Sequence, residues 1–244
     1  MCLRKLLAAL TFLPAAVAMK LYIGNKNYSS WSMRSGVLLA AFGIPFEEVL
    51  LPFDFRPGSD WERQIAAVSP TRRVPVLVED DGFTVWETLA IAEYIADRHP
   101  EHAIWPRDAR ARARARSLCA EMHAGFGRLR TVCPMNCEAF FPDIGARLWA
   151  EDAALRADVA RLDAAWSEAL AASGGPYLFG AFGAVDAFFA PVAVRLSRFS
   201  LPLSERAAAY RDALLAHAAV EDWIADGLRE QQFVPEDEPY RTGR

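Results

Sequence analysis

Residues 73–91 read RVPVLVEDDGFTVWETLAI, and this stretch predicts a strand, a turn, a second strand and a helix. Residues 74–78 are apolar, and Pro75 lies near their start. A proline there suits a strand whose first residues donate no hydrogen bond to the sheet. Asp81-Gly82 is a strong hairpin signal, so the chain is expected to return as a strand over 83–85. Residues 87–98 then carry apolar side chains at helical spacing.

The segment before this pattern completes a small α/β domain. It predicts a strand at 21–23, a helix at 32–42, a strand at 46–51 and a short helix at 61–68. The resulting order, β-α-β-α-β-β-α, is similar to a thioredoxin-like layout. We therefore expect such a domain over residues 19–100.

Everything after a linker at 99–106 is predicted to be helical. Residues 185–198 are nearly all apolar apart from Asp186, which predicts a central buried helix. The chain therefore has a second, all-helical domain over 106–235, and the polar tail after Phe233 is expected to be loose.

The composition excludes several classes of protein. With 244 residues, a formal net charge of -4 and 53% hydrophobic residues, the chain has no electrostatic case for binding nucleic acid. The arginines alternating with alanine between 107 and 116 are expected to form a solvated helix face. Four cysteines make no disulfide framework, and Cys133 and Cys137 have no suitably spaced histidine, so we expect no metal site.

Residues 1–18 stand apart from the rest. Arg4 and Lys5 precede an apolar run ending Ala16-Val17-Ala18, which resembles a secretory signal and is too short to span a membrane. The rival explanation is a start codon placed too early, because Met19 opens a strand directly. We favour the second, which predicts a cytoplasmic protein without a membrane anchor; a real signal would predict a periplasmic one.

The sequence Ser29-Ser30-Trp31-Ser32-Met33-Arg34 lies where the first helix should begin. A helix start presents free N–H groups and a partial positive charge, which favour a thiolate. A free thiol has a pKa near roughly 8.5, so a hydroxyl donating to the sulfur would shift it toward the anion. The alternative is a serine that only caps the helix, as we expect of Ser30 and Ser32.

Two other segments suit the ends of a bound peptide. A cis peptide at Val74-Pro75 would turn the Val74 backbone toward a ligand, whereas a trans proline at a sheet edge would not. Glu87-Thr88 opens a helix and either caps it or binds a ligand. In the binding case Glu87 suits an ammonium group and Thr88 suits a carboxylate.

Taken together, these segments resemble the glutathione transferases from residue 19 to about 235. The Ser29–Arg34 motif is similar to that of the zeta and tau classes, where the first serine lies five residues before an arginine. Residues 73–77 resemble the family's cis-proline segment, and residues 86–91 its Glu-Ser-x-Ala-Ile segment with Thr88 for serine. Residues 177–188 resemble the motif before the family's central helix, with Gly183 where serine or threonine is usual.

The resemblance implies a site and an assembly. Its catalytic candidates are Ser29 and Ser30, and glutathione would lie on Trp31, Arg73, Val74, Pro75, Glu87 and Thr88. The second substrate would lie between the halves, against Tyr28, Trp31, His123, Phe126, Arg130 and Asn136. Spacings of three and four predict that His123, Phe126 and Arg130 share a helical face. A homodimer is also implied, with no metal.

The implied function is that of a glutathione S-transferase, whose bound thiolate attacks a small, electrophilic, partly apolar molecule. An alternative is a glutathione-dependent cis-trans isomerase of the maleylacetoacetate isomerase type, although Trp31 replaces the cysteine of the zeta motif. Another is a non-catalytic protein-binding module with the same fold. With no cysteine at the activating position, cysteine-dependent thiol transfer is disfavoured, and the second substrate stays unidentified.

Overall fold

The computed structural model describes residues 19–244. Residues 1–18, interpreted above as a signal or as the result of a start codon placed too early, lie outside the described residues. One four-stranded sheet has the order β2-β1-β3-β4. Its strands are β1 (Met19–Ile23), β2 (Glu47–Leu50), β3 (Val76–Glu79) and β4 (Thr84–Trp86). Strands β1 and β2 run parallel, whereas β3 is antiparallel to both of its neighbours. The predicted β3–β4 hairpin is confirmed, and its turn uses a left-handed Gly82 with φ 87°.

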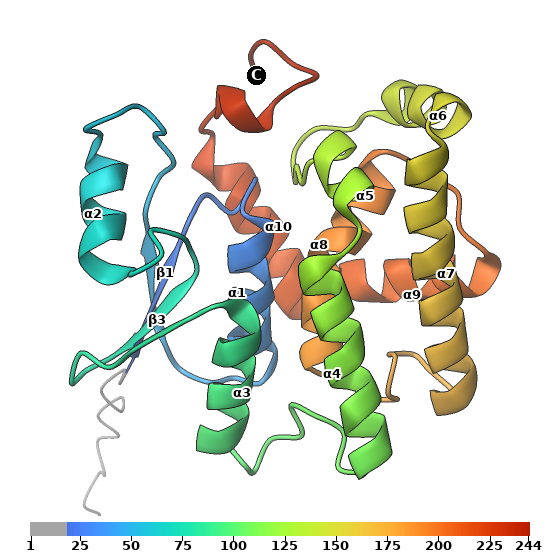
Figure 1. Ribbon diagram of the computed structural model, residues 1–244, viewed down its shortest axis with the longest axis horizontal. Helices are drawn as coiled ribbons and strands as arrows, with labels where there is room; N and C mark the ends of the chain where they lie inside the picture. Colours follow the sequence, from blue (N-terminus) through green and yellow to red (C-terminus); the bar gives the residue numbers. More distant parts are fainter. Residues whose placement is uncertain (1–18) are drawn as a thin grey trace, which may run out of the picture.

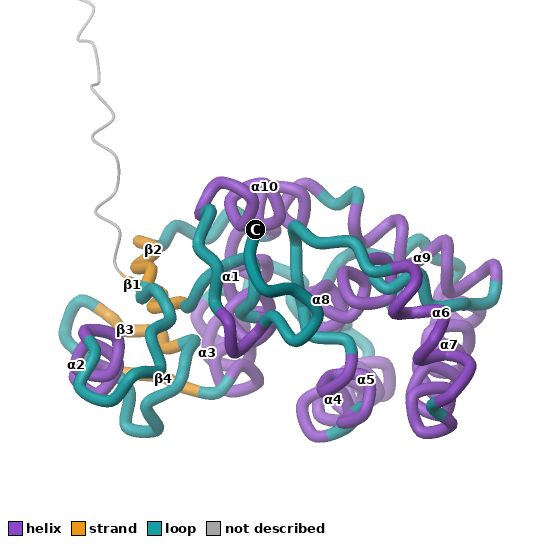
Figure 2. The backbone as a smooth tube through the Cα atoms, turned by 90° about the horizontal axis from the view of Figure 1, so that it is seen from above, coloured by secondary structure: helices purple, strands orange, loops and turns teal. Residues whose placement is uncertain are grey.

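Helices lie on both sides of this sheet. Helices α1 (Ser30–Ala41) and α3 (Thr88–Arg98) lie between the sheet and the helical half, and α2 (Asp60–Val68) lies on the opposite side (Figures 1 and 2). Helix α1 starts two residues earlier than predicted. The reason is its cap: the Ser29 side chain, and not that of Ser30 or Ser32, accepts a hydrogen bond from a first-turn N–H, that of Ser32.

The second half is helical, as predicted. Its helices are α4 (Ala109–Ala124), α5 (Gly127–Val132), α6 (Pro142–Glu151), α7 (Ala153–Ser173), α8 (Ala184–Arg198), α9 (Glu205–Leu215) and α10 (Ala218–Glu230). Helix α8 is buried along most of its length, and α1 packs against both α8 and α10. Helix α1 therefore packs against the helical half over two of its helices, and α3 also contacts α4. None of the helices in residues 19–244 has the length and apolarity to cross a membrane.

Asp186 fixes the start of α8. Its fully buried carboxylate accepts hydrogen bonds from the Gly183 N–H at 2.9 Å, the Leu178 N–H at 3.2 Å and the Tyr210 hydroxyl at 2.7 Å. Burial raises the pKa of Asp186 to about 6. Glycine suits position 183 because a Cβ there would lie 3.0 Å from the Ile104 carbonyl oxygen.

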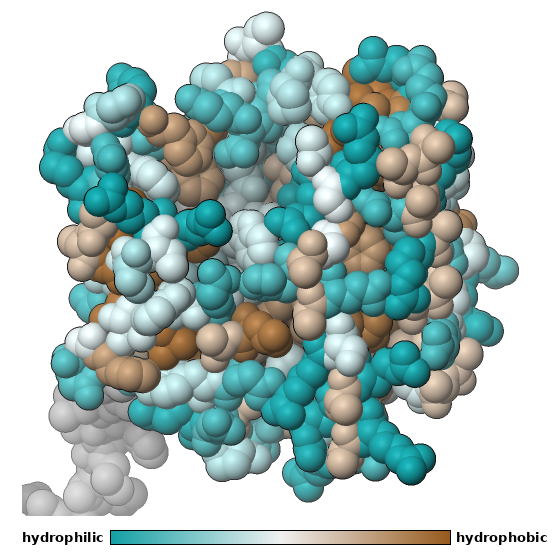
Figure 3. Space-filling model, viewed as in Figure 1, coloured by the Kyte–Doolittle hydropathy of each residue, from teal (hydrophilic) through white to brown (hydrophobic). Residues whose placement is uncertain are grey.

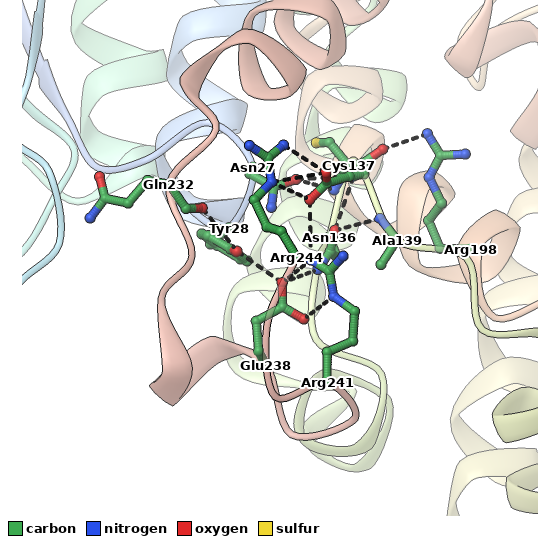
Figure 4. A network of polar contacts seen from close by, with 11 residues as sticks. Asn27, Tyr28, Asn136, Cys137, Ala139, Arg198, Gln232, Glu238, Arg241 and Arg244 are labelled. Carbon is green, nitrogen blue, oxygen red and sulfur yellow. Dashed lines mark hydrogen bonds and ion pairs between the residues drawn. The ribbon is translucent and has the colours of Figure 1, made fainter.

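The prediction of a loose tail is wrong. The chain after α10 folds back through a short 3-10 helix at Pro235–Asp237 and buries Glu238. The Glu238 carboxylate accepts hydrogen bonds from the Tyr28 hydroxyl and the Asn136 amide, each at 2.8 Å, and also pairs with Arg241 (Figure 4). Buried acceptors of this kind order a segment that composition alone marks as polar.

The loop between β1 and α1 is held from the far end of the chain. Glu230 accepts from the Lys26 N–H at 2.7 Å, and Gln232 accepts from the Asn25 amide at 2.9 Å. Trp223 on α10 donates its indole N–H to the Lys26 carbonyl at 3.1 Å. The loop that leads into α1 is thus positioned by residues of the helical half.

Gly36→Ala is expected to loosen the contact between α1 and α10. A Cβ at position 36 would lie 2.2 Å from the Trp223 ring, so the helices must separate, at a cost of about 1–3 kcal/mol. Thermal or denaturant unfolding measures this loss. The control is Ser35→Ala, whose buried hydroxyl has no hydrogen-bond partner among the described residues. Equal stability of the two variants would contradict the close approach of α1 and α10.

Candidate active site

A cleft between the two halves opens at the start of α1. Its volume is about 690 Å³. The side chains that line it come from both halves and include Tyr28, Ser29, Ser30, Trp31, Arg73, Val74, Arg130 and Arg195. A separate cavity of about 660 Å³ lies between α4, α7 and the start of α8, and none of the predicted site residues lines it. The first cleft is therefore the candidate active site.

Ser29 is held by a second serine. Its Oγ accepts from the Ser32 N–H at 3.3 Å and donates to the Ser32 Oγ at 2.7 Å, which also accepts from the Gly24 N–H at 3.1 Å. Hydroxyl protons rotate to suit their partners. To donate to an anion in the cleft, the Ser29 hydroxyl would therefore turn its proton away from Ser32.

Ser30 has different surroundings. Its hydroxyl oxygen accepts from the Arg195 guanidinium at 3.1 Å, and Arg195 comes from the buried helix α8. Both predicted catalytic serines thus line the same cleft, where Ser29 lies in a neutral hydroxyl pair and Ser30 beside a positive charge. The choice between them stays a prediction.

The Val74-Pro75 peptide bond is cis. Pro75 lies just before β3, outside the strand itself, so its missing N–H removes no bond between strands. Arg73 and Val74 both line the cleft. The sequence left both the cis and the trans form of this bond open, and the structure has the cis form.

Glu87 and Thr88 lie at the start of α3. The Glu87 side chain makes no capping hydrogen bond, is 44% exposed and lies 3.6 Å from the His123 ring nitrogen. Its backbone has φ 68°, a conformation that non-glycine residues hold mainly where the surroundings impose it. The Thr88 hydroxyl is buried and has no hydrogen-bond partner among the described residues. Buried polar groups are normally paired, so this hydroxyl is available for a further hydrogen bond. Neither Glu87 nor Thr88 is among the residues that line the cleft, so their part in the site stays a prediction.

The expected wall for a second substrate is only partly formed by the predicted residues. Tyr28, Trp31 and Arg130 line the cleft, and His123 packs edge-on against Trp31 with ring centroids 5.0 Å apart. The prediction that His123, Phe126 and Arg130 share a helical face is wrong. Helix α4 ends at Ala124, and Phe126 has a left-handed φ of 55° before α5 begins.

Asn136 lies beside the cleft and has a structural role. It is buried, donates to Glu238 and accepts from the backbone N–H groups of Glu138 and Ala139 (Figure 4). These hydrogen bonds hold the tail in place. Asn136 does not line the cleft, contrary to the prediction.

Several lining residues are absent from the sequence-based prediction. Phe53, Phe55 and Trp61 form an aromatic wall in a segment expected to be mostly loop, with ring centroids 5.2–6.0 Å apart. Arg195 lies in the apolar helix α8, and Asp237 lies in the tail expected to be loose. An arginine inside an apolar helix was a usable signal, because such residues are rarely buried without a role.

The described cysteines do not provide a thiolate. Cys119, Cys133 and Cys137 are buried and free, as expected of small core residues. Burial raises the pKa of Cys133 and of Cys137 to about 12, and that of Cys119 well above its ordinary value. Any reactive sulfur in the cleft must therefore come from a ligand or from outside the described residues.

Comparison with known families accounts for these features. Residues 28–98 match the family described as Glutathione S-transferase, N-terminal domain. This range contains Ser29, the Val74-Pro75 bond and the Glu87-Thr88 pair. Residues 28–98 thus form a domain of the glutathione S-transferase N-terminal family.

Solved glutathione S-transferase structures extend the likeness to the helical half. A glutathione transferase homolog from Burkholderia gl BGR1 with bound glutathione is 25% identical, with a TM-score of 0.63 over 86% of this chain and 98% of that one. A tau-class glutathione S-transferase from mango gives a TM-score of 0.63 at 22% identity, over 85% of this chain and 92% of that one.

Curated relatives match less than half of this chain. Maleylacetoacetate isomerase of Pseudomonas aeruginosa is 32% identical over 120 residues, which are 48% of this chain and 55% of that protein. Glutathione S-transferase theta-1 of Mus musculus is 37% identical over 87 residues, 35% of either chain. The chain thus spans about half the length of the first curated relatives it matches.

Proposed function

We propose that this protein is a glutathione S-transferase that stabilises the glutathione thiolate with Ser29. The observation that carries the proposal is the position of the Ser29 hydroxyl: it caps α1 and opens into the cleft between the halves. The helix start and the hydroxyl both favour the anionic form of a thiol placed there. The sulfur would then form a bond to an electrophilic carbon. The electron pair displaced from that carbon would depart with a leaving group or, in an addition to a double bond, would take up a proton.

The residues of the first half fit glutathione as the co-substrate. Glu87 suits the ammonium of the γ-glutamyl end, and the unpaired hydroxyl of Thr88 suits its carboxylate. Val74, before the cis-proline, lines the cleft, and its backbone N–H and C=O would pair with the peptide part of the ligand. Trp31 and Arg73 complete the proposed binding surface. The enzyme would contribute positioning and a lowered thiol pKa.

Glu87→Gln is expected to weaken glutathione binding about tenfold or more, because a hydrogen bond to a charged group is lost. Titration calorimetry with reduced glutathione measures the change. The matched control is Glu93→Gln on the same helix, since Glu93 pairs with Arg116 on the protein surface. Equal affinities of the two variants would remove Glu87 from the site. Failure of the wild type to bind glutathione at millimolar concentration would favour a non-catalytic binding module.

The isomerase alternative is supported by the curated relatives named maleylacetoacetate isomerase. In that reaction the thiolate adds to the substrate and leaves again, so glutathione is not consumed. Product analysis separates the two reactions. Persistent loss of free thiol supports conjugation, whereas unchanged thiol with an altered double bond supports isomerisation.

We also propose a homodimer in which the first half packs on the partner's helical half. Apolar side chains gather over the β3–β4 hairpin on the left of the face in Figure 3. Phe83 and Trp86 of this hairpin are 54% and 41% exposed, and an interface of this kind would cover them.

A further inference from the structure

The cleft carries an excess of positive charge. Four arginines line it, and among the lining residues in 19–244 Asp237 is the one carboxylate that faces them. Arg130 comes from α5 and Arg195 from α8, so both belong to the helical half. Arg34 lies just beneath, 1% exposed, with its guanidinium 4.1 Å from the Trp31 ring centroid.

Arg72 lies 3.8 Å from Glu62, whereas Arg34, Arg73, Arg130 and Arg195 have no ion-pair partner among the described residues. Arg195 donates to the carbonyl oxygens of Arg130 and Cys133 and to Ser30, and Arg130 donates to the carbonyl of His123. The Nε and Nη1 atoms of Arg34 have no acceptor at all in the described part of the chain. Buried charges are normally paired, so these arginines would be stabilised by a negatively charged group placed among them.

The charges also act on one another. Burial, followed by repulsion from Arg130 and Arg195, lowers the pKa of Arg34 to about 9. Burial, followed by repulsion from Arg130, lowers the pKa of Arg195 to about 10. An anion in the cleft would offset the repulsion among these arginines and favour their charged forms, so anion binding has a direct electrostatic benefit.

The cluster lies beside the proposed reaction point. Arg195 contacts the Ser30 hydroxyl, and the Arg130 guanidinium lies 4.8 Å from the Trp31 ring centroid. The aromatic wall of Phe53, Phe55 and Trp61 borders the same cleft. A ligand with an acidic group near the arginines would therefore have apolar surface available for the rest of its structure.

We propose that the second substrate is an organic acid, whose carboxylate is bound by Arg130 and Arg195 while its apolar part lies on the aromatic wall. This inference rests on the proposed function, because it places the acid beside a glutathione activated at Ser29. Glutathione itself has carboxylates, but its proposed ligands lie on the first half of the chain, whereas Arg130 and Arg195 lie on the second. Asp237 faces the same arginines and competes with the incoming acid.

The test compares 3-phenylpropanoate with 3-phenylpropanamide, which share a shape and differ in charge. Calorimetry on the full chain measures glutathione binding first, and then both probes with and without glutathione. The wild type is expected to bind the acid about tenfold or more tightly than the amide. Arg130→Met is expected to abolish that preference, and Asp237→Asn to raise it several-fold. Arg128→Met on the same short helix is the control, because Arg128 pairs with Asp152 at the surface.

Three results would overturn the proposal. The first is equal binding of acid and amide by the wild type. The second is an unchanged preference in both Arg130→Met and Asp237→Asn, whose expected effects have opposite signs. The third is a loss of glutathione affinity in Arg130→Met as large as its loss of acid affinity, which would assign the arginine to glutathione. A wild type that prefers the acid but does not bind glutathione would overturn the proposed function and leave the acid site supported.

Discussion

Ser29→Ala is expected to return the pKa of bound glutathione from a depressed value toward that of the free thiol, near roughly 8.5. It is also expected to lower kcat/KM about 10²–10³-fold, the usual effect of removing one donor that stabilises a developing anion. The physical reason is the loss of the hydroxyl that faces the cleft at the start of α1. Thiolate absorbance of bound glutathione, followed against pH, measures the shift without knowledge of the second substrate.

Two neighbouring serines provide the controls for this experiment. Ser30→Ala removes an equally buried hydroxyl that already accepts from Arg195, so a smaller shift is expected. Ser32→Ala removes the group that orients Ser29 and keeps Ser29 itself, so an intermediate shift is expected. If Ser30→Ala shifts the thiol pKa and Ser29→Ala does not, the activating hydroxyl is Ser30.

Asp186→Ala is expected to destabilise the fold by about 3–5 kcal/mol. It leaves the N–H groups of Gly183 and Leu178 and the hydroxyl of Tyr210 buried without their acceptor, and each unsatisfied group costs about 1–3 kcal/mol. That loss is a large part of the stability of an ordinary domain. Thermal unfolding measures it, and a Tm lower by about 10 °C is expected for a chain of this size.

Tyr210→Phe is the graded control for Asp186. It removes one of the three hydrogen bonds and keeps the ring that packs on Trp166, with centroids 4.9 Å apart. Its expected cost is about 1 kcal/mol. If Asp186→Ala lowers the Tm no more than Tyr210→Phe does, the two backbone hydrogen bonds at the start of α8 do not contribute to stability.

The elements of the fold were largely readable from local patterns. The hairpin at Asp81-Gly82 and the apolar helix around residues 185–198 are set by turn chemistry and hydrophobic spacing, and both are confirmed. The thioredoxin-like half was predictable for the same reason, since each element follows from its own residues.

The parts of the site that depend on distant contacts were not readable in this way. Helical spacing carried the predicted face through Gly125, where the chain in fact leaves the helix and re-enters it at α5. The order of the tail could not be read from its own residues, because the groups that bind its polar side chains lie more than 100 positions away. Asn136, the partner of Glu238, is an example. Arg195 differs from these, because a charge within an apolar helix was a readable signal, although its local sequence does not show that it lines the cleft.

The contacts between the loop at residues 25–28 and the end of the helical half have a consequence for how the protein folds. Lys26 and Glu230 are separated by 204 positions, so their hydrogen bond can form only after a very long loop of chain has closed. Contacts of such high sequence separation form late and slow the approach to the native state. The sheet can therefore assemble from local pairings before the segment that carries Ser29 is in place. A fragment ending near residue 100 would retain Ser29, the proposed catalytic residue, yet lack the partners that hold its loop.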